Sequence, residues 1–313
     1  MAKPVYLSDV IFDPNTVLTV GTFDGVHCGH RAIINRLTEV ARSKNARSVV
    51  VTFDPHPREI INAVVDKIKL LSTLEERARV LNDLGVDLMI VIPFTRDFSL
   101  LSSQEFVEDV LWKKIGISGF IIGYDHQFGR NREGSIKLVR EIGVRHGFEV
   151  EVIDAQEIGD VTVSSTLIRK TLEDLGDVTS VSGYLGRPYQ LSGIVIHGDK
   201  RGRTIGYPTA NLGITDVRKV IPKNGVYAVK VSIENDNNKH QGMMNIGYRP
   251  TFSGDKKLSL EVHILEFDRD IYGNKLTLEF VERIRDERAF NGIDELKVQL
   301  GLDKISAFKI LQQ

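Results

Sequence analysis

Two patterns of apolar residues alternate through the first part of the chain. Short apolar runs predict buried β-strands over Val17–Val20, Ser48–Phe53, Leu88–Pro93 and Gly119–Gly123, and Val150–Asp154 is predicted to be one more strand. Longer stretches in which apolar residues recur at helical spacing predict helices over His30–Lys44, Leu74–Leu84, Ser103–Lys114, Ile136–Gly147 and Ser165–Leu175. Strands that alternate with helices form βαβ units, so we expect an α/β domain built on a mostly parallel sheet.

The pattern changes near residues 176–186, where the periodicity lapses. Beyond this point, strands separated by turns rich in Gly, Asn and Asp are predicted over Leu191–His197, Gly225–Ile233, His240–Ile246, Leu258–Leu265 and Lys275–Ile284. Two terminal helices are predicted over Gly292–Leu300 and Lys304–Leu311. Strands of this number and spacing indicate a small antiparallel β-barrel. We therefore expect two domains, residues 1–182 and 183–313.

The composition of the chain argues against several classes of protein. Lys and Arg total 41 and Asp and Glu total 42, for a net charge of -1, which argues against a generally basic nucleic-acid binder. Cys28 is the single cysteine, so an intrachain disulfide framework and a zinc site built from cysteines are excluded. No apolar run is long enough to span a membrane, and the first residues lack the pattern of a secretion signal. We expect a cytoplasmic protein without nucleic-acid or membrane partners.

The segment Gly21–His30 connects the first predicted strand to the first predicted helix. Ligands of α/β folds bind where strands end, and a helix N-terminus offers free N–H groups and partial positive charge to an anion. Gly25 and Gly29 leave room for a phosphate beside the backbone. His27 and His30 are three residues apart, so both imidazoles can donate hydrogen bonds to phosphate oxygens. The segment predicts a phosphate site. The alternatives are a metal-binding pair, for which no third ligand is evident, and two surface histidines.

Three later segments of the first domain have similar chemistry. Thr52–Pro57 follows the second strand, and its two prolines predict a rigid extended loop. Gly123–Gly134 follows another strand and carries Arg130 and Arg132, which suit phosphates. Val163–Arg169 places hydroxyl groups and an arginine at the start of a helix, which predicts a second anion site. Taken singly, each of these segments is also compatible with an ordinary turn or helix cap.

The predicted barrel carries a glycine-rich cationic loop, His197–Asn211, after its first strand. Such a loop can fold over phosphates, although three cations between glycines are also common in solvated loops. Thr209 and Asn211 are two apart, so in extended chain they face the same side, and both carry oxygen ligands suited to Mg²⁺. Glu261 lies in a predicted strand on the same face as His263 and is a candidate base. The alternative for Glu261 is a carboxylate that merely faces solvent.

These motifs together resemble the prokaryotic bifunctional riboflavin kinase/FMN adenylyltransferase family, also called FAD synthetases. The HxGH pattern at His27–His30 is similar to that of nucleotidyltransferases, and Pro208–Asn211 resembles the PTAN motif of riboflavin kinases. The resemblance extends from Val17 to about Gln299. It implies a Rossmann-like, doubly wound nucleotidyltransferase domain followed by a riboflavin kinase-like barrel with a terminal helix. Its substrates would be riboflavin, FMN and ATP, and flavin-dependent apoproteins would receive the products.

The resemblance also implies roles for individual residues. Adenylyl transfer would use His27, His30 and Arg169, and phosphorylation would use Glu261 as the catalytic base. ATP and its phosphates would be bound by Gly21, Phe23, Asp24, Gly25, Gly29, Ser164, Ser165, Thr166, Gly198, Lys200, Arg201, Gly202, Arg203 and Thr209. Flavin would be bound by His56, Pro57, Asp125, Arg285 and Phe290. Thr209 and Asn211 would hold Mg²⁺. The chain departs from the family at His126, where phenylalanine is usual.

Two other functions remain open from the sequence. One is a different HxGH nucleotidyltransferase with an unrelated barrel, because HxGH does not identify the acceptor. The other is a flavin-binding regulator without turnover.

Overall fold

The structure is a computed structural model that describes residues 4–61, 68–124, 129, 134–154, 157–158, 161–198, 201–250 and 256–312. For residues 157–158, 161–162, 201, 203, 249–250 and 256–257 only the backbone is described. The chain forms two compact units, Met1–Ser165 and Thr166–Gln313. Within the described residues, no helix has the length and apolar character needed to cross a membrane.

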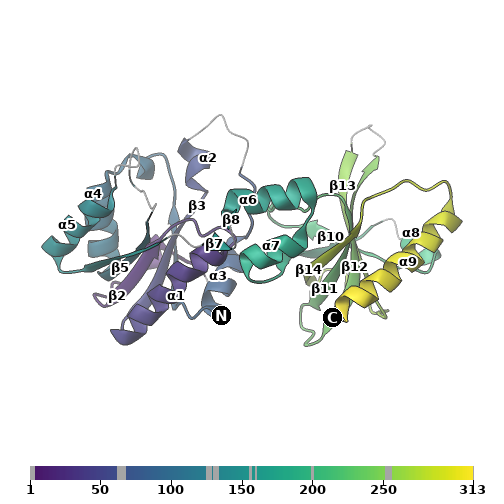
Figure 1. Ribbon diagram of the computed structural model, residues 1–313, viewed down its shortest axis with the longest axis horizontal. Coiled ribbons are helices and arrows are strands. Elements are labelled where there is room, and N and C mark those ends of the chain that lie inside the picture. Colours follow the sequence, from purple (N-terminus) through teal and green to yellow (C-terminus); the bar gives the residue numbers. More distant parts are fainter. Residues whose placement is uncertain are drawn as a thin grey trace. The chain divides into compact units, whose positions relative to one another are not determined.

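The first unit contains a six-stranded sheet in which every strand pair is parallel, in the order β1-β4-β3-β2-β5-β6. Figure 1 labels β2, β3 and β5 of this sheet. The strands are β1 Val5–Tyr6, β2 Thr16–Val20, β3 Arg47–Asp54, β4 Leu88–Pro93, β5 Ile117–Gly123 and β6 Glu149–Ile153. All five predicted strands of this domain are confirmed, each within two residues at either end. The pattern did not predict the short edge strand β1.

Helices cover both faces of this sheet, as a doubly wound fold requires. One face packs against α1 (Cys28–Ser43) and α3 (Leu74–Asp83). The other packs against α5 (Ile136–His146) and the π-helix η3 (Phe106–Ile115), which continues from α4 (Ser103–Glu105). Neighbouring strand residues alternate between the two cores, so that Val50 faces α1 while Val49 and Val51 face η3. The remaining elements are η1 Leu7–Asp9, α2 Pro57–Ile61, η2 Phe98–Leu100, β7 Glu157–Ile158 and β8 Val161–Thr162.

The second unit is a closed antiparallel barrel in the order β10-β13-β12-β11-β14-β9. Its strands are β9 Tyr189–Ile196, β10 Ala210–Ile214, β11 Gly225–Ile233, β12 Lys239–Pro250, β13 Lys256–Ile264 and β14 Lys275–Arg285. Tyr189, Tyr227 and Phe280 fill the interior with edge and tilted ring contacts. The five predicted strands and the barrel are confirmed, and β10 is an additional strand that carries Asn211.

Helices flank this barrel. They are α6 Ser165–Lys170, η5 Thr171–Leu175, α7 Val178–Leu185, α8 Arg201–Thr204 and α9 Ile293–Leu311. The prediction of two terminal helices was wrong, because α9 runs without a break through Gly301. A glycine inside a helix costs about 1 kcal/mol relative to alanine. Packing of Ala307 and Leu311 on the barrel offsets that cost.

Two further expectations need correction. Pro57 does not continue an extended loop but begins the short helix α2, a position where its missing N–H is harmless. Residues 176–186, where the sequence shows no clear periodicity, contain the helix α7. Asp177 caps this helix, because its side chain accepts a hydrogen bond from Ser180 N at 2.9 Å. Val178 and Val181 of α7 are fully buried, and the helix packs against β14 and β9. By contacts, α7 falls within the second compact unit.

Candidate active sites

The loop after β2 lies at the point where the strand order reverses. Strand β3 follows on one side of β2 and β5 on the other, which is where doubly wound sheets bind ligands. The loop has an unusual backbone: Phe23, Gly25 and Val26 have φ values of 45°, 81° and 44°. For a β-branched residue such as Val26 this conformation is strained, at a cost of about 1–3 kcal/mol, and such strain is concentrated at functional sites. Val26 N donates to Phe23 O at 3.0 Å and closes the turn.

The turn brings the two predicted histidines together. The rings of His27 and His30 are stacked, with centroids 3.6 Å apart and planes inclined by 20°, and Phe23 meets His30 edge-on at 5.1 Å. Within the described part of the chain, the Nδ1 atoms of both histidines are buried without a hydrogen-bond partner. Buried polar atoms are normally paired, so these two atoms are consistent with a site that receives a polar ligand.

Both imidazoles are neutral at physiological pH. Burial lowers the pKa of His27 to about 4, and the nearby Asp24 carboxylate opposes this shift only in part. Burial, and then the electrostatic influence of the neighbouring His27 ring and of the Arg77 guanidinium, hold the pKa of His30 well below its usual range. A neutral imidazole still donates one hydrogen bond, so each ring can serve a phosphate oxygen without carrying charge. Among the described residues, no group of three His, Cys, Asp or Glu side chains is placed so that it could hold a metal ion.

Asp24 occupies a different position from the histidines. Its side chain is 1% exposed and accepts hydrogen bonds from the backbone N–H groups of Leu71 and Ser72, both at 3.0 Å. Arg77 Nη2 lies 3.5 Å from its carboxylate. The carboxylate is thus engaged by protein groups, while Gly25 N donates to Ser72 Oγ at 3.0 Å. Asp24 fixes the loop in place.

The other predicted residues of this domain lie on three segments. His56 and Pro57 are half-buried at the start of α2, and Arg58 N donates to His56 Nδ1 at 3.2 Å. Ser165 Oγ donates a hydrogen bond to the backbone oxygen of Asp24 at 3.0 Å. This bond joins the start of α6 to the segment Gly21–His30, which is called the glycine-histidine loop below. Ser164 and Thr166 are exposed, and Arg169 is half-buried. Asp125, His126, Arg130 and Arg132 lie outside the described residues.

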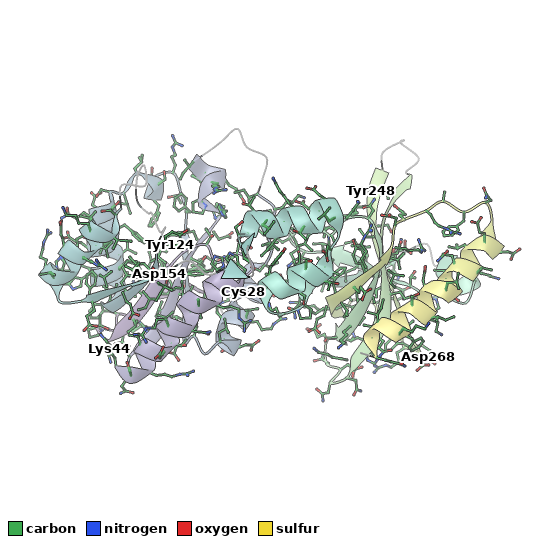
Figure 2. All side chains as sticks on the ribbon, in the orientation of Figure 1. Cys28, Lys44, Tyr124, Asp154, Tyr248 and Asp268 are labelled. Carbon is green, nitrogen blue, oxygen red and sulfur yellow. The ribbon has the colours of Figure 1, made fainter. Side chains whose placement is uncertain are left out.

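Figure 2 places Cys28 at the start of α1 and Lys44 directly after its end. The loop Gly21–His27 leads into the N-terminus of a 16-residue helix, with His27 directly before the helix and His30 in its first turn. The positive end of the helix dipole at this place favours an anionic ligand.

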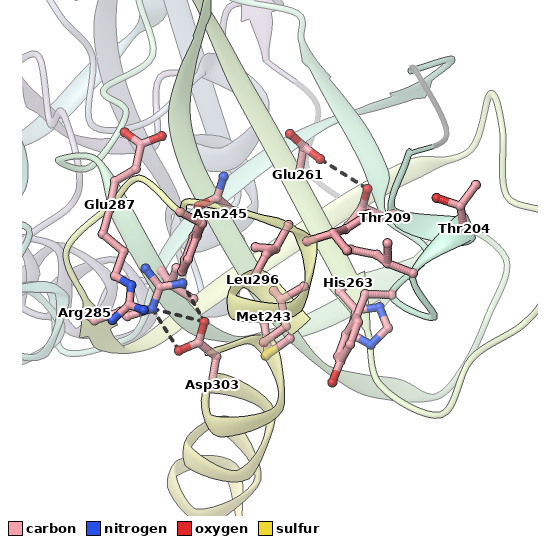
Figure 3. Close-up of a pocket in the computed structure, with 18 residues that line it drawn as sticks. Thr204, Thr209, Met243, Asn245, Glu261, His263, Arg285, Glu287, Leu296 and Asp303 are labelled. Atoms are coloured by element: carbon pink, nitrogen blue, oxygen red, sulfur yellow. Dashed lines mark hydrogen bonds and ion pairs between the residues drawn. The ribbon is translucent and has the colours of Figure 1, made fainter. Parts of the chain in front are cut away.

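The barrel carries a cavity of about 510 Å³. The strand residues that line it alternate with fully buried residues such as Tyr227, Met244 and Val262, so the cavity lies on the outer face of the barrel, beneath α9. Its lining is mixed apolar and polar: Gly202, Thr204, Ile205, Tyr207, Thr209, Val226, Met243, Asn245, Glu261, His263, Arg285, Glu287, Arg288, Phe290, Ile293, Leu296, Leu300 and Asp303. Figure 3 shows its labelled residues converging from the strands, the loop before β10 and α9. Glu261 and His263 share this face, as predicted.

Strand register aligns the polar residues in one row. Asn211 of β10 pairs with Glu261 of β13, Glu261 pairs with Asn245 of β12, and Asn245 pairs with Val226 of β11. Residues that pair directly across antiparallel strands point to the same face. The row therefore places an amide, a carboxylate and a second amide side by side above the cavity.

Glu261 links the row of Asn211, Glu261 and Asn245 to Thr209, which lies in the loop before β10. Thr209 Oγ1 donates to Glu261 Oε2 at 3.2 Å (Figure 3). Ser259 Oγ donates to Glu261 Oε1 at 2.9 Å. A side chain at Gly198 would collide with the Asn211 amide in its present position, so the absence of a side chain at Gly198 leaves room for that amide. The predicted constellation of Thr209, Asn211 and Glu261 is thus brought together.

The rest of the cationic loop is described in part. Gly202 lines the cavity in the short helix α8, Lys200 lies outside the described residues, and for Arg201 and Arg203 only the backbone is described. His263 Nδ1 lies 2.7 Å from the backbone oxygen of Pro208. Because a carbonyl oxygen only accepts, Nδ1 carries the proton, and His263 holds the start of the PTAN segment from below. Burial lowers the pKa of His263, so the ring is neutral.

Arg285 and Phe290, predicted to bind flavin, both line the cavity. Arg285 also forms a two-pronged ion pair with Asp303 of α9, with Nε–Oδ1 at 2.9 Å and Nη2–Oδ2 at 2.7 Å. Asp303 is 1% exposed and accepts a further hydrogen bond from Gln299 at 2.8 Å. This pair fastens α9 to the end of β14 and so shapes one wall of the cavity. Sequence reasoning missed Asp303, because α9 carries several charged residues and only its packing against β14 shows which of them is buried and paired.

Comparison with known proteins agrees with the two sites. The FAD synthetase family model matches residues 11–167, and the riboflavin kinase family model matches residues 185–311. A bifunctional riboflavin kinase/FMN adenylyltransferase of Listeria monocytogenes is 40% identical over 307 residues, and the match covers 96% of both chains. Its counterpart in Escherichia coli strain K12 is 39% identical over 292 residues, covering 93% of this chain and 91% of the relative.

A solved structure also resembles the whole chain. It is named as a macrolide-efflux protein from Streptococcus pneumoniae, is 32% identical, and superposes with a TM-score of 0.86 over 96% of each chain. The two-unit architecture is therefore shared with an experimentally determined fold. The two family matches end at residue 167 and begin at residue 185, while the contact division falls at residues 165/166. The predicted boundary at residues 182/183 stays a prediction.

Proposed function

The chain belongs to the family of bifunctional riboflavin kinases/FMN adenylyltransferases, and we propose how its residues divide the two reactions. The enzyme phosphorylates riboflavin with ATP to give FMN, then adenylylates FMN with ATP to give FAD and pyrophosphate. We assign phosphorylation to the barrel, residues 183–313, and adenylyl transfer to residues 1–182. The assignment is supported chiefly by the row of Asn211 and Glu261 above a cavity in the barrel, remote in sequence from the stacked histidines. FMN and FAD would then be taken up by flavin-dependent apoproteins, in the cytoplasm.

In the kinase reaction, the riboflavin 5′-hydroxyl oxygen forms a bond to the γ-phosphorus of ATP. The bond from that phosphorus to the β,γ-bridging oxygen breaks, and ADP leaves. Glu261 accepts the hydroxyl proton, while the hydrogen bonds from Thr209 and Ser259 hold its carboxylate in place. The apolar part of the cavity suits the flavin ring, with Phe290 and Arg285 at its wall. We assign binding of the ATP phosphates to Gly198, Gly202 and the cations Lys200, Arg201 and Arg203, of which Arg201, Gly202 and Arg203 belong to the short helix α8.

The same row fits a magnesium ion. The Thr209 hydroxyl, which donates to Glu261, and the Asn211 amide, which lies opposite Glu261 across the strands, offer oxygen atoms beside the Glu261 carboxylate. Mg²⁺ prefers oxygen ligands and is usually held by few protein groups together with phosphates and water. We assign Thr209 and Asn211 as its protein ligands. The ion would supply charge neutralisation on the ATP phosphates.

Replacement of Asn211 by alanine tests this assignment. The variant should need a higher magnesium concentration for half-maximal FMN formation and should turn over more slowly, because the cation loses one oxygen ligand. A magnesium titration of FMN formation measures both effects. The control is Asn238→Ala, which removes an exposed amide in the turn between β11 and β12. An Asn211→Ala enzyme with the parent magnesium dependence would remove Asn211 from the metal site.

In adenylyl transfer, an FMN phosphate oxygen attacks the α-phosphorus of ATP in line. The bond from that phosphorus to the α,β-bridging oxygen breaks, and pyrophosphate leaves. His27 and His30 donate hydrogen bonds to the α-phosphate as charge accumulates on its oxygens, beside the backbone of Gly21, Phe23, Gly25 and Gly29. Ser164, Ser165, Thr166 and Arg169 bind the departing pyrophosphate. His56, Pro57 and Asp125 contact the flavin.

The division of labour is tested with fragments. A fragment beginning at Thr166 keeps the whole second compact unit and should make FMN but no FAD. A fragment beginning at Gly183 should catalyse the same reaction with a lower melting temperature, because it lacks the buried side chains of Val178 and Val181. Burying one such side chain stabilises a fold by about 1.5–3 kcal/mol. Chromatography identifies the products that each fragment forms from riboflavin, ATP and magnesium. FAD formation by either fragment would refute the assignment of adenylyl transfer to residues 1–182.

A further inference from the structure

Arg77 is a charged residue at a buried position of its helix, where an apolar residue would be expected. It lies on α3 and is 3% exposed, next to Ala78, which belongs to the apolar core of the first unit. Arginine is almost never fully buried unless it is paired, and a buried ion pair contributes little net stability compared with a hydrophobic replacement. The burial of Arg77 therefore points to a role beyond stability.

The guanidinium of Arg77 joins three segments that are far apart in the sequence. Nη1 donates to Thr52 Oγ1 at the end of β3, at 3.1 Å. Nη2 donates to Ser72 O at 3.3 Å, and Nε to Ser72 Oγ at 3.4 Å. Nη2 also lies 3.5 Å from Asp24 Oδ1, in the loop that carries the histidines. The planar fork of arginine matches several acceptors in one plane, which a lysine ammonium cannot do.

Each of these contacts is extended by a second bond toward the glycine-histidine loop. Thr52 Oγ1 donates to Thr22 O at 3.1 Å, and Ser72 Oγ accepts from Gly25 N at 3.0 Å. Thr22, Asp24 and Gly25 are therefore all fixed, directly or through one side chain, by Arg77. The strained backbone at Phe23 and Val26 lies between and beside these fixed points. Strained conformations persist only where the surrounding structure determines them strongly.

Asp24 also contacts the second predicted anion site, the hydroxyl motif at residues 164–166. Its backbone oxygen accepts from Ser165 Oγ at 3.0 Å, at the start of α6. Arg77, Asp24 and Ser165 thus form one chain of contacts from α3, through the loop, to the hydroxyl motif. This chain of contacts fixes the segment assigned to the α-phosphate relative to the segment assigned to pyrophosphate.

We propose that Arg77 is the positioning residue of the adenylyl-transfer site, fixing the histidine loop and the hydroxyl motif through Asp24. The proposal rests on the function proposed above for His27 and His30. Arg77 acts without touching the substrate: it keeps both imidazoles at the geometry that the transition state requires. Misplacement of catalytic groups by about 1 Å can cost about 10²-fold in rate.

The test compares Arg77→Met with Arg79→Met, a half-buried arginine two residues further along α3. Because loss of Arg77 leaves the buried Asp24 carboxylate without its cation, the double variant Asp24→Asn/Arg77→Met is measured alongside and removes both charges. Folding is followed by thermal unfolding. FMN formation from riboflavin in the same chain measures the competence of the barrel.

In the variants that fold, kcat for FAD formation from FMN should fall by about 10²-fold, while the KM for ATP changes little and FMN formation stays at the parent rate. Arg79→Met should match the parent in both reactions. A folded Arg77→Met enzyme or double variant with the parent kcat for FAD formation would overturn the proposal, and so would a rise in KM with unchanged kcat. The histidine assignment is tested separately by His30→Ala, so that failure of either idea can be recognised.

Discussion

Glu261→Gln is expected to lower kcat for riboflavin phosphorylation by about 10²–10⁴-fold, the usual contribution of a general base. Glutamine has nearly the shape of glutamate, so its side-chain oxygen can still accept a hydrogen bond from Thr209 or Ser259. It cannot accept the proton that the 5′-hydroxyl releases. The lost interaction belongs to the transition state, so the KM for ATP should change little. Initial rates of FMN formation over a range of riboflavin and ATP concentrations measure both quantities.

Two controls accompany this variant. Glu282→Gln removes an exposed carboxylate from β14 of the same barrel, outside the cavity, and should leave FMN formation unchanged. FAD formation from supplied FMN should be unchanged in both variants, because that site is assigned to the other domain. If Glu261→Gln forms FMN at the parent rate, the base lies elsewhere. Asp268 is the next acid to examine, although it is exposed in the segment before β14 (Figure 2).

The parts of the fold that depend on local pattern could be predicted from the sequence. Buried parallel strands are apolar on both faces, so β2, β3, β4 and β5 appear as short unbroken apolar runs. Strand β10 was missed because its sequence, Ala-Asn-Leu-Gly-Ile, contains few strand formers and is fixed by pairing with β9 and β13. The break expected in α9 was wrong for a related reason, since packing on the barrel outweighs the glycine at position 301.

The sites could be predicted as motifs, but their internal contacts could not. Alternation along β13 placed Glu261 and His263 on one face, and the structure confirms it. The pairing of Arg285 with Asp303 joins residues 18 positions apart on different elements, and the bonds from Arg77 reach 25 positions back to Thr52. Such pairs depend on tertiary packing, which no single-sequence pattern specifies. Asp24 shows the consequence: its motif suggested a phosphate ligand, while its carboxylate is engaged by backbone amides and Arg77.

His30→Ala should lower kcat for FAD formation by about 10²–10³-fold, which is the typical cost of losing one donor to charge that develops in the transition state. Riboflavin phosphorylation by the same protein should be unchanged and serves as the internal control. His30→Gln tests the protonation state as well. Since the pKa of His30 is held well below its usual range, the ring acts as a neutral donor, and a neutral amide N–H should restore part of the rate.

The pH dependence of the parent enzyme follows from the same reasoning. A neutral histidine whose pKa is lowered stays neutral until the pH falls to that lowered value. Protonation of His27 should therefore reduce FAD formation only as the pH approaches about 4, and not near the ordinary histidine value of 6.5. Values of kcat/KM for FAD formation between pH 4 and 8 report this decrease, because kcat/KM follows the pKa values of the free enzyme. A loss of rate centred near pH 6.5 in the parent, together with full activity of His30→Ala, would show that the stacked histidines do not carry the reaction.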